Sequence, residues 1–89
     1  LADDKRDTIR ANAIEALGYL FTQDSFDRLL TTLKEDKNTR VRGAAAAGLG
    51  HTKSPKAVAA LQAAADGDKA FTVKDLAMRA LKEIGATGK

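Results

Sequence analysis

The sequence is poor in the residues that most catalytic and metal sites require. Its 89 residues include no cysteine, no tryptophan, one histidine and one proline, and only 4% are aromatic. The lack of cysteine excludes a disulfide framework, a thiolate metal site and a cysteine nucleophile. It also mildly favours a cytosolic location for the protein. The single histidine, His51, excludes a two-histidine metal site and leaves no histidine-glutamate pair. His51 follows a predicted helix end, where contact with exposed carbonyls accounts for it.

Long apolar runs and phosphate-binding loops are also missing. The longest apolar stretch falls short of the ~20 residues needed to cross a bilayer, and no signal-peptide pattern opens the chain. Gly48 and Gly50 precede no Gly-Lys-Ser/Thr loop. The carboxylates lie near predicted helix boundaries, where acids commonly cap helices, and none pairs persuasively as acid and base. We therefore expect a cytoplasmic protein with no catalytic residue, cofactor, metal or membrane partner; an enzymatic role is least favoured and would need a partner subunit.

Acidic residues are absent from the middle of the chain, between Asp36 and Asp66. Five bases and no acid give this interval a charge of +5, within a chain whose net charge is +3. A basic surface can attract nucleic acid. A solvated surface explains the same charges and is favoured, because the bases flank a predicted helix and lie some ~20 Å apart. The candidates for nucleic-acid contact are Lys37, Arg40, Lys53 and Lys56.

What the chain has in abundance is an internal repeat. Residues 41–50, Val-Arg-Gly-Ala-Ala-Ala-Ala-Gly-Leu-Gly, match residues 9–18 and 73–82, which gives a 32-residue period. A β-branched residue, a base, an alanine and a leucine fall into register in each copy. Residues 1–5 match 33–37 and 65–69 at the same step, so Leu1 is predicted to end a helix whose beginning is missing. We expect the chain to be cut from a longer protein with at least one more repeat ahead of it.

The first predicted helix starts at Asp7 and Thr8, where an acid can accept hydrogen bonds from the free amides of the first turn. Its apolar residues recur at the three-and-four spacing of one helix face. Ile14 and Phe21 widen this stripe, which favours a helix packed on two sides, and Tyr19 is expected at the surface. The residues predicted to be buried are Ile9, Ala13, Ala16, Leu17 and Leu20.

Four more helices are predicted from capping residues and apolar spacing. They run over about 23–35, 39–50, 55–65 and 71–84; Thr22 and Ser54 cap the second and fourth, and Gly85 ends the fifth. Asp27, Arg28, Thr31 and Thr32 are expected to point to solvent, as is an alanine face of the fourth helix. The residues predicted to be buried are Phe26, Leu29, Leu30 and Leu33; Val41, Ala44, Ala45, Gly48 and Leu49; Val58, Leu61 and Ala65; and Val73, Leu76, Ala77, Ala80, Leu81 and Ile84.

A helix pair that repeats with this period, and whose first helix carries a hydrophobic-Arg-x-x-Ala-x-x-x-Leu-Gly core, resembles the HEAT-like repeats first grouped with phycobilisome lyases. Lys74 replaces the arginine, Lys82 replaces the glycine, and Ala47-Gly48 replaces the usual alanine before Leu-Gly, which suggests that the third copy lies near an end of the array. The residues that carry the resemblance are Ile9-Arg10, Ala13 and Ala16-Leu17-Gly18; Val41-Arg42, Ala44-Ala45 and Leu49-Gly50; and, more weakly, Val73-Lys74, Ala77 and Ala80-Leu81.

The resemblance implies an all-α fold, an armadillo-like α-solenoid (α-α superhelix) of about two and three-quarter helical hairpins. We predict one domain over residues 1–89. In this division 1–5 end a preceding repeat, 7–36 form the first repeat, 38–67 form the second, 69–86 form the first helix of a third, and 87–89 are a tail.

One basic residue per repeat is expected to form a ladder along the stack. Such a ladder could grip a phosphate backbone. In the family that the chain resembles, each base lies beside the acid that closes the preceding repeat, and acids stand in that register here, so structural ion pairing and capping are favoured. The ladder consists of Arg10, Arg42 and Lys74 with Asp4, Asp36 and Asp68.

The fold resemblance leaves function open. Some similar proteins attach or detach bilin chromophores, as lyase subunits or adaptors; others hold iron with repeated His-Glu motifs or excise alkylated DNA bases with tryptophans, and this chain has neither feature. We favour a non-catalytic scaffold that binds another protein through the surface of successive second helices. Nucleic-acid binding and a phycobilin lyase-type subunit or adaptor are the alternatives. The predicted protein contacts are Asp27, Arg28, Thr31, Ala59, Ala60, Gln62 and Ala63.

Overall fold

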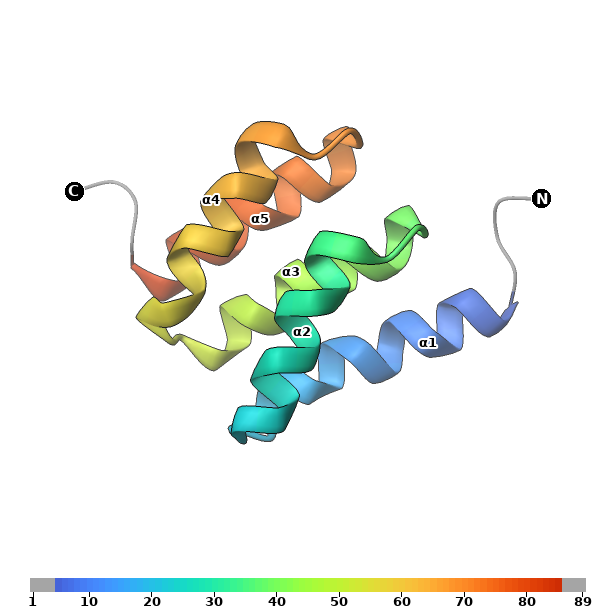
Figure 1. Cartoon of the computed structure of the whole chain (residues 1–89), viewed down its shortest axis with the longest axis horizontal. Helices are drawn as coiled ribbons and strands as arrows, with labels where there is room; N and C mark the ends of the chain where they lie inside the picture. The colour runs from blue at the N-terminus through green and yellow to red at the C-terminus, as the bar shows by residue number, and fades with distance from the viewer. Residues whose placement is uncertain (1–4, 86–89) are drawn as a thin grey trace.

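The computed structural model describes residues 5–85, which are helical apart from short connections (Figure 1). The predicted helices are all present, but the first already includes Lys5, ahead of its predicted start, and the third continues to Thr52. Within this range no strand occurs. The elements are α1 (Lys5–Ala16), a 3₁₀ turn η1 (Leu17–Tyr19), α2 (Gln23–Glu35), α3 (Thr39–Thr52), a 3₁₀ turn η2 (Pro55–Ala57), α4 (Val58–Gly67) and α5 (Phe71–Ile84).

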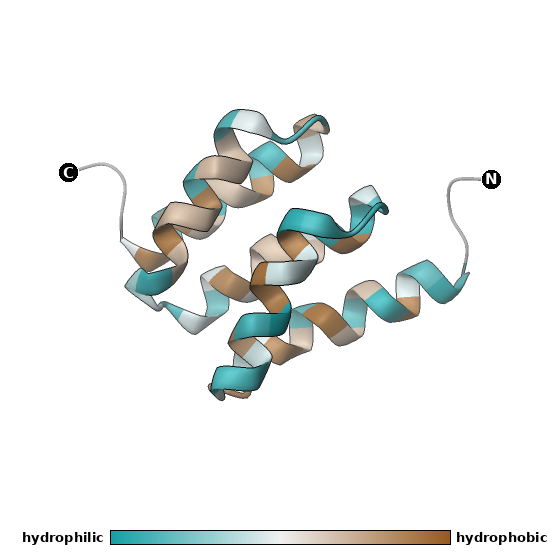
Figure 2. Cartoon of the chain, in the orientation of Figure 1, coloured by the Kyte–Doolittle hydropathy of each residue, from teal (hydrophilic) through white to brown (hydrophobic). Residues whose placement is uncertain are grey.

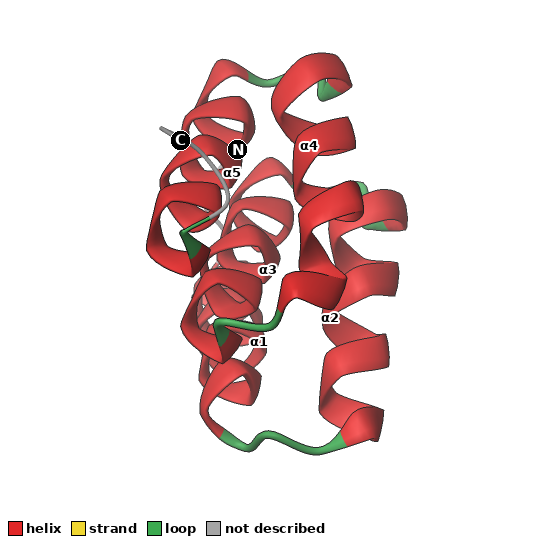
Figure 3. Ribbon diagram, turned by 90° about the vertical axis from the view of Figure 1, so that its left-hand side faces the viewer, coloured by secondary structure: helices red, strands yellow, loops and turns green. Residues whose placement is uncertain are grey.

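The helices form two layers (Figure 3). The first helices of the repeats, α1, α3 and α5, lie side by side in one layer, and the second helices, α2 and α4, form the other. α3 is central, because it packs against α1, α2 and α5. The molecule measures 41 × 27 × 17 Å. This arrangement is the predicted all-α solenoid.

Side-chain caps set three of the helix starts. Thr22 Oγ1 accepts a hydrogen bond from the amide of Ser25 at 3.1 Å, Asn38 Oδ1 from that of Val41 at 3.1 Å, and Ser54 Oγ from that of Lys56 at 3.2 Å. Each oxygen satisfies an amide that has no partner within the first turn. The predicted caps Thr22 and Ser54 are therefore confirmed. Ala70 begins α5 with a similar backbone conformation and no such cap.

The core is centred on α3, as its apolar spacing predicts. Val41, Ala45 and Leu49 are fully buried, and so are Leu29 of α2 and Leu61 of α4. Hydrophobic residues recur at intervals along α1, α2 and α5, whereas α4 is apolar along most of its length (Figure 2). The spacing in α1, α2 and α5 lets each of these helices bury one side while the other stays hydrated.

α1 buries a different face from the predicted one. Ala11, Ile14 and Gly18 are buried against the rest of the molecule, and Leu17 is half-buried. The reason is positional: α3 covers one side of α1, and within the described residues no helix covers the opposite side. The predicted core residues that are exposed instead are Ile9, Ala13 and Ala16 of α1, together with Leu20 and Phe21, which follow η1 and lie outside the helix.

α4 differs from its prediction by a small rotation. Val58 and Ala65 are half-buried, while Ala57 and Ala64 are buried in their place. The helix opens with a 3₁₀ turn of about 3.0 residues instead of 3.6, which shifts the residues that point inward. Other residues predicted to be buried, namely Phe26, Leu30, Leu76 and Ile84, are half-buried, as are Thr32 and Ala60, which were expected to be exposed.

Candidate groove between the second helices

A groove separates α2 from α4 on the outer side of the second layer. Its volume is about 430 Å³. Leu33 and Ala64 form a buried floor, at 4% and 9% exposure. The groove is open because α4 carries alanines opposite the leucines of α2, so the two helices leave space between them. The lining residues are Leu30, Thr31, Leu33, Lys34 and Glu35 on the α2 side and Ala60, Ala63, Ala64, Gly67 and Asp68 on the α4 side.

Several residues predicted to contact a partner line this groove. Thr31 projects from α2, and Ala60 and Ala63 project from α4. Asp27 and Arg28 line a second hollow on the same helix, which Thr31 joins to the groove. The remaining two predicted residues, Ala59 and Gln62, are exposed on α4 but line neither hollow.

Sequence reasoning missed the end of the groove. Lys34, Glu35, Gly67 and Asp68 lie there, where both second helices end. The available signal was periodic: Gly67 and Asp68 stand one full repeat after Glu35 and Asp36, so the ends of the two second helices had to be neighbours in a stack. Charges of both signs therefore lie beside the apolar floor.

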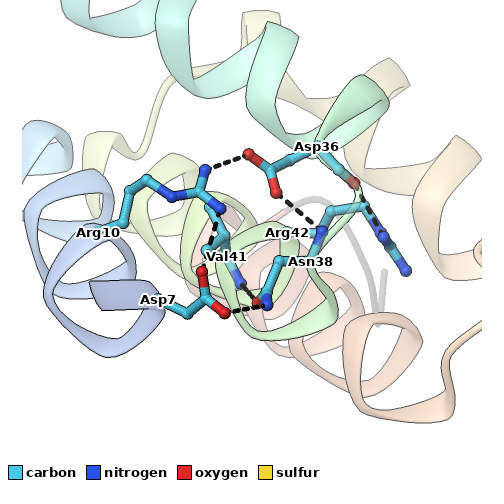
Figure 4. Close-up of polar contacts among 6 residues, drawn as sticks. All are labelled: Asp7, Arg10, Asp36, Asn38, Val41 and Arg42. Carbon is cyan, nitrogen blue, oxygen red and sulfur yellow. Dashed lines mark hydrogen bonds and ion pairs between the residues drawn. The ribbon is translucent and has the colours of Figure 1, made fainter. Parts of the chain in front are cut away.

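The repeated base and acid form ion pairs across each repeat. Arg10 Nη1 lies 2.6 Å from Asp36 Oδ2 (Figure 4). Arg42 binds Asp68 through two hydrogen bonds, from Nε at 2.9 Å and from Nη2 at 3.1 Å. Each arginine side chain pairs with the carboxylate that closes its own repeat, whereas the predicted register placed it beside the acid that closes the preceding repeat; Arg42 contacts that acid, Asp36, through its backbone carbonyl. Asp4 of the predicted ladder lies outside the described residues, and no ion pair is recorded for Lys74 among the residues described.

Arg42 also connects neighbouring repeats. Its Nη1 donates to the backbone carbonyl of Asp36, the residue that ends α2, at 2.9 Å. The Arg42 side chain is 14% exposed and that of Asp68 is 8% exposed, whereas Arg10 is 49% exposed. A shielded bidentate pair is stronger than an exposed one, so the Arg42 pair contributes more to stability than the Arg10 pair.

These contacts lower the pKa values of both aspartates. Burial alone would raise the pKa of the Asp36 carboxyl, but hydrogen bonds from Arg10 and from the Asn38 amide, with the charges of Arg10 and Arg42, hold it below its usual value. Burial would also raise the pKa of the Asp68 carboxyl, but the hydrogen bonds from Arg42 and from the Ala70 amide outweigh burial and lower that pKa. The hydrogen bond to Asp36 raises the pKa of Arg10.

Asn38 joins the first ion pair to the start of α3 (Figure 4). Its amide nitrogen Nδ2 donates to Asp7 at 3.0 Å, while its backbone N–H donates to Asp36 at 2.9 Å. The same side chain caps α3 through Val41. One residue thus fixes the loop between the repeats and the start of the central helix.

Comparison with known families identifies this repeat. The family model for HEAT repeats matches residues 1–82. The chain belongs to the HEAT-repeat family. No curated protein and no solved structure matches it. The match is to HEAT repeats in general, so the resemblance to the phycobilisome lyase type stays a prediction.

The HEAT-repeat register also aligns a column of unlike side chains. Tyr19, His51 and Glu83 occupy equivalent positions in the three copies. The rings of Tyr19 and His51 stack with centroids 4.7 Å apart. His51 Nε2 lies 2.9 Å from Glu15 Oε2, and Nδ1 lies 3.4 Å from Glu83 Oε2. The expectation that His51 has no glutamate partner and contacts helix-end carbonyls is therefore wrong; it links α1, α3 and α5.

The basic residues of the middle HEAT repeat lie at two separate places. Lys37 and Arg40 stand at the start of α3, and Lys53 and Lys56 follow its end. A 14-residue helix separates the pairs by about 20 Å at 1.5 Å per residue. The acids Asp36 and Asp68, which end α2 and α4, lie beside Arg42 near the start of α3. These four bases therefore form no single continuous patch.

Within residues 5–85 no cluster of three or more histidine or acidic side chains could hold a metal ion. Over the same range no helix is long and apolar enough to span a membrane.

Proposed function

We propose that this HEAT-repeat chain is a non-catalytic scaffold that binds another protein in the groove between α2 and α4. HEAT repeats generally mediate protein interactions. The observation that carries the proposal is an apolar-floored groove of about 430 Å³ between the two second helices.

The groove lining indicates the chemistry of the bound segment. Leu30, Leu33 and Ala64 offer apolar surface, and burying an aliphatic side chain there would contribute about 1.5–3 kcal/mol. Lys34 and Glu35 offer one charge of each sign at the end of the groove. We therefore expect a short segment with one or two aliphatic anchors followed by a polar or charged residue.

A pair of substitutions on one helix tests this assignment. Ala60→Glu places a carboxylate in the groove, whereas Ala59→Glu places the same group on exposed α4 surface outside it. Peptides selected from a displayed library against the whole chain would be measured by calorimetry. We expect Ala60→Glu to weaken binding by at least about tenfold, because a charge would displace apolar contact, and Ala59→Glu to leave it within about twofold.

The control for folding is the melting temperature and helical circular dichroism of both variants. Equal affinity of folded Ala60→Glu and Ala59→Glu would refute the groove assignment. Arg28→Glu, added to Ala60→Glu, would show whether the adjoining hollow contributes, since Arg28 lines that hollow and not the groove.

Nucleic-acid binding and a bilin-lyase role remain predictions without a supporting observation. Binding through Lys37, Arg40, Lys53 and Lys56 would weaken steeply with added salt. A lyase-type role would require a partner subunit. Peptide binding that is insensitive to salt would favour the scaffold.

A further inference from the structure

The two ends of the helix stack have different surfaces. Residues at equivalent positions of the repeats can be compared directly, since among the described residues a neighbouring helix covers this face of α3 and of α5 but not this face of α1. Ile9 is 61% exposed on α1, whereas its counterparts Val41 on α3 and Val73 on α5 are fully buried. Ala13 and Ala16 are exposed too, while their counterparts on α3 and α5 are buried.

The covered copies show what kind of neighbour this face takes. Gly18 of α1's repeat faces Gly48 of α3, and Gly50 faces Ala80 of α5 in the same way. A Cβ added at Gly50 would lie 2.9 Å from Ala80 Cα. Each first helix is thus approached by a preceding helix pair that presents a glycine, and the position on α1 equivalent to Gly48 and Ala80 is Ala16.

The opposite face, on α5, lacks the matching residues. Ala11, Ile14 and Gly18 on the first copy correspond to Gly43, Ala46 and Gly50 on the second, and all are buried. On α5 the corresponding residues are Asp75, Met78 and Lys82. Met78 is 52% exposed, and Asp75 pairs with Arg79 at the surface at 3.1 Å. A polar face of this kind is typical of the terminal repeat of an array.

We propose that the outer face of α1 is a docking surface for a further helix pair of the same repeat type, carried ahead of α1 in the same polypeptide. The surface consists of Ile9, Asn12, Ala13, Ala16 and Tyr19. The glycine of the docked pair lies against Ala16. A second copy of this chain is a poor occupant, because its own α5 would bring Lys82 to the place where glycine is needed.

The half-exposed arginine of the first repeat fits this proposal. Arg42 is shielded because its repeat packs against the end of α2, where it binds the carbonyl of Asp36. Arg10 is the equivalent residue and its side chain is 49% exposed. Docking of a preceding pair would cover Arg10 as α2 covers Arg42. On this side of α1, the apolar residue Ile9 and the charged residue Arg10 are therefore both more exposed than their counterparts in the next repeat.

A fusion tests the proposal. A copy of residues 37–68 is placed directly before Lys5, which keeps the repeat period because Asp68 then precedes Lys5 as Asp36 precedes Lys37. We expect amide hydrogen exchange in α1 to slow by at least about tenfold, since α1 would gain a packed neighbour, and the fusion to unfold in one transition.

The matched control carries Gly50→Lys in the added copy only. This change places a lysine, as at Lys82, where the added copy would meet Ala16. We therefore expect amide exchange in α1 to return to its original rate while residues 5–85 stay folded. Independent unfolding of the added pair with unchanged exchange in α1 would overturn the proposal. Sedimentation of the original chain provides a second measurement: a monomer supports it, and a stable dimer that protects α1 would make a second copy the occupant and overturn it.

Discussion

Gly18 lies directly against the backbone of Gly48, so the turn η1 that follows α1 approaches α3 at a pair of glycines. A Cβ at Gly18 would overlap the Gly48 carbonyl oxygen and lie 2.9 Å from its Cα. Backbone atoms cannot move aside as a flexible side chain can. The Leu-Gly signature of the first two repeats therefore reflects close helix packing, and Lys82 can replace glycine on α5 because no described residue covers that place.

Gly18→Ala is predicted to destabilise the chain by about 1–3 kcal/mol, the usual cost of overpacking a tight contact. Urea unfolding would measure the change. Gly67→Ala is the matched control, because a Cβ at Gly67 meets nothing within 4 Å and helix propensity would add up to about 1 kcal/mol of stability. Equal effects of the two substitutions would contradict the packing explanation.

Ala70→Asn is predicted to stabilise the chain by about 0.5–2 kcal/mol. Asn38 and Ala70 occupy equivalent positions with similar backbone angles, but only Asn38 caps its helix. Thermal melting would detect the gain. Ala70→Gln is the comparison, because its longer side chain is a poorer cap; a gain as large in that variant would show that capping is not the cause.

Lys53→Gly is predicted to stabilise the chain by up to about 1 kcal/mol. Lys53 has a φ of 55° and ends α3 in the left-handed region, which costs a residue with a side chain about 1–2 kcal/mol. Gly85 occupies the equivalent position at the end of α5. Lys56→Gly, at a position without positive φ, should instead lose stability. Denaturant melts of both variants give the comparison.

Asp68→Asn is predicted to reduce stability at neutral pH and to flatten its dependence on pH under acid conditions. The folded-state pKa of Asp68 is below its usual value, so the stabilisation is present above about pH 4 and is lost as pH falls through the folded-state pKa. Urea melts from pH 3 to pH 7 would measure this.

Asp36→Asn is the comparison for that series. Its partner Arg10 is 49% exposed, against 14% for Arg42, so solvent screening should make its effect smaller. A larger loss in Asp36→Asn than in Asp68→Asn would contradict the ranking of the two ion pairs.

The sequence predicted helix positions and caps better than it predicted which helix faces are covered by a neighbouring helix. Helix positions and the caps Thr22 and Ser54 follow from short-range chemistry, and the burial of Val41 and Leu49 follows from spacing within one helix. The exposure of Ile9 could not be read in the same way, because its spacing matches that of Val41. Burial there depends on whether another helix pair is present.

The candidate site was predictable only in part for a similar reason. Thr31, Ala60 and Ala63 line the groove, and the helix period had predicted them on the outer faces of the second helices; their contact with a partner stays a prediction. Lys34 and Gly67 were missed because their meeting depends on how two helix ends are stacked, and not on either helix alone. The pairing of Arg42 with the Asp68 carboxylate was missed because a periodic ladder of bases and acids fits either register, and Arg42 contacts an acid of both.

The most direct test of the groove is amide NMR of the whole chain during titration with a peptide selected for binding. If the groove between α2 and α4 is the binding surface, the largest shifts should fall on Thr31, Ala60 and Ala63. Shifts concentrated at Lys53 and Lys56, beyond the far end of α3, with those three amides unchanged, would contradict the account.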